Sequence, residues 1–153
     1  MSIYEVCLEV HNFFAKDSDI HKGEYTIADG AITNVGFLAE NQYFRIKGSV
    51  FNDGVYKYTS EALDDLIAES FTGEIWAMSP PKAFIEMCDK MSDWENRYGG
   101  VDSAAMSPFN SESFGGYSYS KSSNTGADGS SAGNSVFGVF ASDLNKWRRL
   151  NRV

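Results

Sequence analysis

The stretch from Val101 to Val136 constrains the fold most, because it is too polar to contribute to a hydrophobic core. It contains eleven Ser, five Gly and three Asn, and its apolar side chains are few and scattered. A segment of this composition cannot offset the entropy cost of ordering through its own burial. We therefore expect a loop or an extended arm that gains order from a partner, with the core formed by the residues before and after it.

The first residues predict a short amphipathic helix. Ser2 and Glu5 form a capping-box pattern, in which each side chain satisfies a backbone amide of the first helical turn. Apolar residues then recur at helical spacing, at Ile3, Cys7, Val10 and Phe14. We expect the helix to bury this face and to end near Lys16 and Asp17.

From Gly23 onward the pattern changes to short segments rich in aromatic and β-branched residues, which is typical of strands. Asp29-Gly30 favours the positive φ angles of a type I′ turn, so residues 24–28 and 31–32 are expected to form a hairpin. Residues 61–67 could form one or two helical turns. Further strands are expected at residues 42–47, 55–58 and 73–78, which gives an antiparallel sheet of about three to five strands.

Two more helices are predicted after the sheet. Pro80-Pro81 favours a helix start, because proline at the first helical position costs no hydrogen bond. This helix is expected to run to about Tyr98. One stripe of it is expected to hold Phe84, Met87, Cys88, Met91, Trp94 and Glu95. The predicted organisation is a core at 1–100, a Ser/Gly-rich arm at 101–136, and a C-terminal helix with a basic tip at 137–153.

The charge is unevenly distributed along the chain. The whole chain carries a net charge of −8, yet four of its 13 cations lie at the C-terminal end, at Lys146, Arg148, Arg149 and Arg152. The remaining nine cations and 21 acids leave the body at −12. This balance disfavours specific nucleic-acid binding, which needs a local excess of Lys and Arg. No apolar run reaches membrane-spanning length.

No residue pattern indicates catalysis, a cofactor or a metal. His11 and His21 lack neighbours at ligand spacing, and Asp64, Asp65 and Glu69 lie in a segment expected to be solvated. Gly115-Gly116 lacks the Lys and Ser/Thr of a phosphate-binding loop. Cys7 and Cys88 fall among apolar residues and are expected to be buried thiols. We expect a non-enzymatic protein.

Two segments of the second half suggest a family. Residues 110–120, Asn-Ser-Glu-Ser-Phe-Gly-Gly-Tyr-Ser-Tyr-Ser, are followed after a spacer by Leu-Asn-Lys-Trp-Arg-Arg-Leu at 144–150. Together with the helix after Pro80-Pro81, this order resembles head-tail connector (adaptor) proteins of long-tailed bacteriophages. Residues 44–56 are similar to uncharacterised proteins from prophage head-tail gene clusters.

The resemblance implies a structural virion protein in the phage neck, assembled in the host cytoplasm. Such subunits form a homo-oligomeric ring, typically a dodecamer, between the portal protein and a stopper or tail-completion protein. The expected fold class is α+β: a helical adaptor-like framework, with a small antiparallel β-sheet inserted after the first helix, a Ser/Gly-rich extended arm and a C-terminal helix.

Two groups of residues are the candidate partner-binding sites. At the tip, Trp147 is expected to fill a partner pocket while Arg148, Arg149 and Arg152 pair with acidic groups of the portal. The alternative is a terminal helix packed on its own domain with solvated arginines. In the arm, Phe114, Tyr117 and Tyr119 are expected to lie along a strand added to another subunit.

Other functions remain open at this point. The β-rich first half fits another neck or tail component, such as a stopper or tail-completion protein. The aromatic surplus and the Ser/Gly segment also fit a module that binds carbohydrate or peptide ligands.

Overall fold

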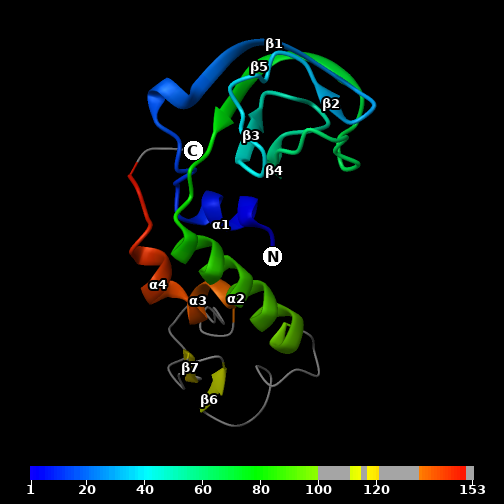
Figure 1. Cartoon of the computed structure of the whole chain (residues 1–153). Helices are drawn as coiled ribbons and strands as arrows, with labels where there is room; N and C mark the ends of the chain where they lie inside the picture. Colours follow the sequence, from blue (N-terminus) through cyan, green and yellow to red (C-terminus); the bar gives the residue numbers. More distant parts are fainter. Residues whose placement is uncertain (100–110, 115–116, 121–134, 151–153) are drawn as a thin grey trace. The chain divides into compact units, whose positions relative to one another are not determined.

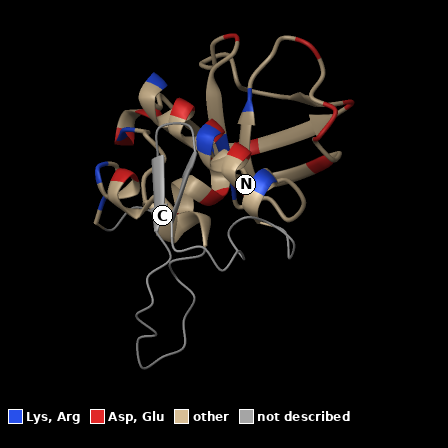
Figure 2. Ribbon diagram, turned by 90° about the horizontal axis from the view of Figure 1, so that it is seen from below, with Lys and Arg blue, Asp and Glu red and all other residues tan. Residues whose placement is uncertain are grey.

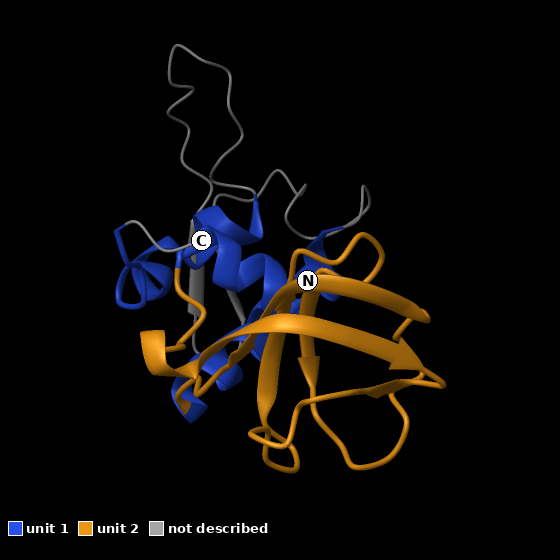
Figure 3. Cartoon of the chain, turned by 90° about the horizontal axis from the view of Figure 1, so that it is seen from above, with its two compact units in different colours: residues 1–11, 82–151 blue, residues 12–81, 152–153 orange. Residues whose placement is uncertain are grey.

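The structure is a computed structural model that describes residues 1–99, 111–114, 117–120 and 135–150, with the backbone alone for the two middle segments. The chain divides into two compact units (Figure 3). Residues 12–81 form one, which we name the sheet unit. The other, the helical unit, is formed by residues 1–11 and by the described residues between 82 and 150. Each unit is described by itself.

The sheet unit is built on a curled antiparallel sheet (Figure 1). Its five strands lie in the order β2-β1-β5-β3-β4, and the sheet stays open as a half-barrel. A single 3₁₀ turn, η1 (Asp17–Asp19), precedes the first strand. The strands are β1 (Ile20–Ala28), β2 (Ala31–Ile32), β3 (Tyr43–Lys47), β4 (Gly54–Lys57) and β5 (Glu69–Ala77).

The long pairing of β1 with β5 makes the sheet the main framework of the described chain. The register runs from Ile20 opposite Trp76 to Ile27 opposite Glu69. On its other side, β5 pairs with β3, where Phe44 lies opposite Ala77. The predicted fold class is therefore wrong: the described chain is strand-dominated, and the sheet is not a small insertion in a helical adaptor-like framework. Both long strands pair residues far apart in the chain, which local patterns do not reveal.

Local features of the sheet unit were predicted better. The Asp29-Gly30 hairpin is confirmed, with φ angles of 50° and 74° at the turn and Ala28 opposite Ala31. The helix considered for residues 61–67 does not form, and turns replace it. The Leu63 amide donates instead to the carbonyl oxygen of Gly30 at 3.0 Å, which ties this segment to the hairpin turn.

A hydrophobic core lies within the sheet unit. Phe44 is fully buried, and its ring lies 5.8 Å from that of Tyr56 and 6.4 Å from that of Tyr58. Side chains from the strands and from the connecting loops surround it: Tyr25, Ile27, Val35, Leu38, Ile46, Leu66, Phe71, Ile75 and Ala77. This core includes loop residues, so it fixes the loops as well as the strands.

The helical unit begins with α1 (Ile3–Glu9), which contacts α2 (Lys82–Tyr98). The capping box is confirmed, because Ser2 and Glu5 satisfy each other's backbone amides. The helix ends earlier than expected, since His11 and Phe14 take positive φ angles that a helix excludes. The stripe predicted for α2 is confirmed for its five apolar residues, which are all buried, while Glu95 is partly exposed.

Two short helices, α3 (Val136–Val139) and α4 (Ala141–Asn145), replace the single C-terminal helix that was predicted. They are anchored by Phe140 and Leu144, which are both fully buried. Within the arm, β6 (Ser111–Phe114) and β7 (Tyr117–Ser120) pair antiparallel with each other. Addition of this segment to another subunit stays a prediction, and so do the predicted domain boundaries.

Candidate partner-binding surfaces

The C-terminal tip, residues 146–150 in the described chain, is tied to the helical unit. The Trp147 ring packs edge-on against Phe84, with centroids 5.7 Å apart and planes at 77°. Arg148 Nη1 donates to the carbonyl oxygen of Glu9 at 2.8 Å, and Nη2 pairs with the Glu9 carboxylate. The Arg149 amide donates to the carbonyl oxygen of Val10 at 2.9 Å. The tip is therefore held at the end of α1.

These contacts separate the predicted tip residues into two groups. Trp147 is half-buried and Arg148 has an internal ion pair, as expected for a tip packed on its own unit. The side chain of Arg149 is exposed. Leu150, which sequence reasoning missed, is 94% exposed. The structure does not describe Arg152 or the side chains of Phe114, Tyr117 and Tyr119. Their predicted roles therefore stay predictions.

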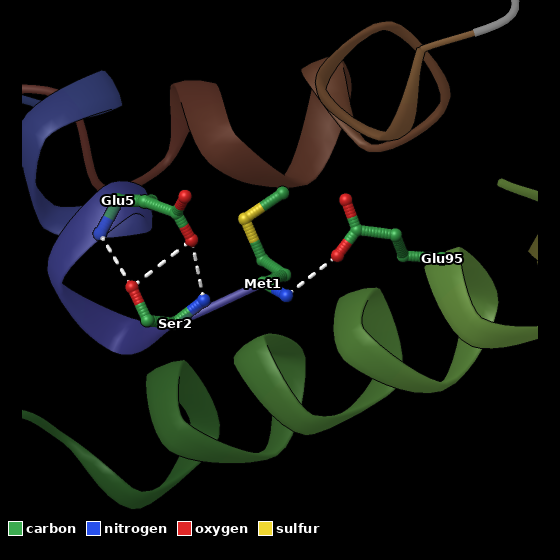
Figure 4. Close-up of polar contacts among 4 residues, drawn as sticks. All are labelled: Met1, Ser2, Glu5 and Glu95. Carbon is green, nitrogen blue, oxygen red and sulfur yellow. Dashed lines mark hydrogen bonds and ion pairs between the residues drawn. The ribbon is translucent and has the colours of Figure 1, made fainter.

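The helical unit also contains an open pocket of about 670 Å³. Its lining includes Trp94 and Phe137 and three carboxylates, those of Glu5, Glu9 and Glu95. The Met1 amino group lies 2.5 Å from Glu95 Oε2 (Figure 4). This hydrogen bond raises the pKa of the Met1 amino group, because the carboxylate favours its protonated form.

Each carboxylate of this pocket already has an internal donor. Ser2 donates to Glu5 from its amide at 2.6 Å and from its hydroxyl at 3.0 Å (Figure 4). These bonds, that of the backbone amide first, lower the pKa of Glu5. Glu9 pairs with Arg148, and Glu95 with the Met1 amino group. Glu5 therefore caps the start of α1, Glu95 ties α2 to the first residue, and Glu9 ties the end of α1 to the tip.

A second surface, in the sheet unit, was not predicted. Val50 is 81% exposed, Phe51 63% and Ile67 55%, and we name these three residues the apolar patch. Val50 and Phe51 follow β3, and Ile67 precedes β5. The side chain of Asn52 joins the two segments: its Oδ1 accepts from the Ile67 amide at 2.7 Å and its Nδ2 donates to the Ile67 carbonyl at 2.9 Å.

Glu69 holds the loop of the apolar patch in one conformation. Its carboxylate accepts from the Val50 amide at 2.9 Å, from the Phe51 amide at 3.4 Å and from Asn52 Nδ2 at 3.0 Å. The Ser49 hydroxyl donates to the same carboxylate and sets its pKa below the ordinary value, and the other donors act in the same direction. Exposed apolar side chains are thus presented on a loop fixed by polar bonds.

The lowered pKa of Glu69 predicts how the loop depends on pH. A carboxylate with a lowered folded-state pKa stabilises the fold above its ordinary pKa, and this contribution is lost as pH falls through the folded value. We expect the Val50 and Phe51 amide resonances to shift on acidification below about pH 4.5, the ordinary value for glutamate.

NMR titration of the Glu69→Gln variant checks this expectation. The neutral amide cannot titrate, so the acid shift of the two resonances should disappear. Glu61→Gln, at an exposed acid of the same unit, is the matched control and should leave the shift in place. An unchanged titration in Glu69→Gln would contradict the assignment of Glu69 as the group that holds the loop.

The histidines, acids and cysteines that sequence reasoning considered and set aside have structural surroundings in the described chain. Among the described residues, no three His, Cys, Asp or Glu side chains are grouped so that they could hold a metal ion. His21 stacks on Phe37 with ring centroids 3.6 Å apart, which gives it a packing role. Both cysteines are buried, as the sequence predicted.

Arg45 is an interior cation that sequence reasoning missed. Its guanidinium carbon lies 3.9 Å from the centroid of Phe13 and 4.8 Å from that of Trp76. Cation–π contact of this kind stabilises a charge that is removed from water. The sequence did not predict the burial of Arg45, because Arg45 alternates with the apolar Phe44 and Ile46. That pattern is typical of a strand residue that faces solvent.

Comparisons with protein-family models, with curated proteins and with solved structures gave no match for this chain. Within the described residues, no helix is both long enough and apolar enough to cross a membrane.

Proposed function

We propose that this chain is a non-enzymatic structural protein of a phage neck, which forms a ring between the portal protein and a stopper or tail-completion protein. The observation on which this depends is the C-terminal tip. The tip lies within residues 144–150, one of the segments that resemble adaptor proteins. Contacts with Phe84 and Glu9 hold its exposed residues, Arg149 and Leu150, in place. An ordered basic tip with an exposed apolar residue is more typical of a surface that binds another protein than of one that faces only water.

The distribution of surfaces also supports ring assembly. The tip is basic, whereas the sheet unit has five cations and eleven acids. Figure 2 marks the Asp and Glu positions of the described chain in red, several of them on loops. A chain with two unlike surfaces makes heterologous contacts, which close into a ring when the rotation between subunits allows it. Each subunit of a closed ring is then held on two sides.

A second candidate is a stopper or tail-completion protein of the same neck. The strand-dominated sheet unit favours it, because the resemblance to adaptors implies a mostly helical fold, and the described chain does not have one. Both candidates share the structural role and the ring, and they differ in position along the particle axis.

Cryo-EM of intact particles of the phage that encodes this chain tests the proposal. A ring of the chain directly beneath the portal supports the adaptor, and a ring one layer further down supports the stopper. Absence of the chain from the neck of the mature particle would contradict both. Mixing the purified chain with purified portal rings, followed by mass photometry, gives an independent test of portal attachment.

A further inference from the structure

We propose that the apolar patch of one copy receives the C-terminal tip of the next copy. In this contact Leu150 packs against Val50, Phe51 and Ile67, and Arg149 faces the acids that precede Ile67. The inference rests on the ring assembly proposed above and names the two surfaces that build it.

The exposed apolar residues point to this pairing. Among the described residues, four large hydrophobic side chains are exposed: three form the apolar patch and the fourth is Leu150. Exposed apolar groups of this size that are gathered on one surface mark a contact site. The patch is in the sheet unit and Leu150 is in the helical unit, so the chain carries an apolar patch and a separate exposed apolar side chain that contact between neighbouring copies can bury together.

Both surfaces are ordered before they meet. The Glu69 carboxylate and the Asn52 side chain fix the loop of the patch. The Trp147 ring and the Arg148 guanidinium fix the tip. Association then requires little additional ordering of backbone, and ordering is a large part of the cost of forming an interface.

The charges around the two surfaces are complementary. Asp64 and Asp65 are exposed, and they lie in the segment leading to Ile67, while Asp53 is exposed beside the loop. At the tip, Lys146 and Arg148 pair internally with Asp143 and Glu9, and the side chain of Arg149 is exposed. Complementary charges at the border of an apolar contact set its register and steer association.

Because the two surfaces differ, the contact is head-to-tail. Each copy offers one tip and one patch, so a chain of contacts continues from copy to copy until it closes. One such contact between two copies leaves one tip and one patch uncovered, and these are covered either by a reciprocal second contact in a dimer, which would give covalent dimers in place of a ladder, or by closure of a larger ring.

Disulfide cross-linking of Phe51→Cys/Leu150→Cys tests the contact directly. The native cysteines interfere little, because both are buried and burial raises the pKa of Cys88 to about 12. Rings are assembled from the purified variant, with portal rings as template where needed, and are sized by mass photometry before oxidation. Non-reducing electrophoresis should then show a ladder of covalent multimers, and neither single-cysteine variant should give a ladder.

Other results overturn the inference in distinct ways. Rings of the correct mass without a ladder would reject this contact and leave the proposed function standing. Covalent dimers of Phe51→Cys alone would show that patch meets patch, and an intrachain disulfide would show that the tip covers its own patch. Cross-linking of Leu150→Cys to the portal would assign the tip to that partner. Failure of the unmodified chain to assemble, alone or on portal rings, would reject both proposals.

Charge reversal gives a second readout without cysteines. Arg149→Glu should weaken assembly on the order of tenfold, because it places an acid opposite Asp64 and Asp65. Combining it with Asp64→Arg/Asp65→Arg in the same chain should restore assembly. Lys82→Glu makes the same charge change at another exposed side chain and should have no effect. Equal losses for Arg149→Glu and Lys82→Glu, with no rescue, would overturn the pairing.

Discussion

Phe44→Ala is expected to lower the free energy of unfolding of the sheet unit by about 3–5 kcal/mol, the range for truncating a fully buried Phe. Phe44 is fully buried in the core and lies on β3, which pairs with both β4 and β5. The rings of Tyr56 and Tyr58 pack around it and would be left facing a cavity. Since small domains are stabilised by about 5–15 kcal/mol in total, this loss should leave the unit close to unfolding.

Urea denaturation followed by far-UV circular dichroism measures the effect as a shift of the midpoint. Phe51→Ala is the matched control, because it removes the same side chain from a position that is 63% exposed. It should change the free energy of unfolding by no more than about 0.5 kcal/mol. A loss below about 1 kcal/mol for Phe44→Ala would contradict the packing of this core.

The elements that sequence reasoning predicted correctly are those whose signals are local. The Asp29-Gly30 turn needs only two residues with positive φ, and the Ser2–Glu5 capping box needs side chains three positions apart. The apolar face of α2 repeats every three or four residues over a long helix. In each case the physical cause lies within a few residues, so the chain displays it directly.

The parts that sequence reasoning missed depend on residues far apart. The long register between β1 and β5 turns a supposed insertion into the framework of the sheet unit, and no local pattern specifies it. For the same reason, residues 61–67 gave a helical pattern, while the structure ties Leu63 to the distant carbonyl of Gly30. Tertiary contacts override weak local propensity in short segments.

The candidate surfaces illustrate the same limit. The sequence identified the C-terminal tip but not its internal partners, since Arg148 and Glu9 are 139 positions apart. The apolar patch was missed because two hydrophobic residues at the end of a strand look like core. Only the bonds from Glu69 and Asn52 show that Val50 and Phe51 are held on the surface.

Gly73→Ala is expected to destabilise the sheet unit by about 1–3 kcal/mol, the cost of adding an atom to a filled space. A Cβ at Gly73 would overlap the carbonyl oxygen of Lys47, and it would also lie 3.1 Å from the Phe71 ring. Here the chain leaves β3 through Gly48, whose φ of +92° requires glycine. Neither backbone can move away without breaking the pairing of β3 with β5, so the clash should be relieved by loss of that pairing.

Gly23→Ala provides a closely matched control, because Gly23 lies directly opposite Gly73 in the β1–β5 register. A Cβ at Gly23 meets nothing within 4 Å, so it should leave the midpoint unchanged or raise it slightly through the entropy of the unfolded chain. Urea midpoints of the two variants, measured side by side, separate steric overlap from glycine flexibility. Equal shifts of the two midpoints would show that β3 does not approach β5 closely at Gly73. The strand order β2-β1-β5-β3-β4 would then need revision.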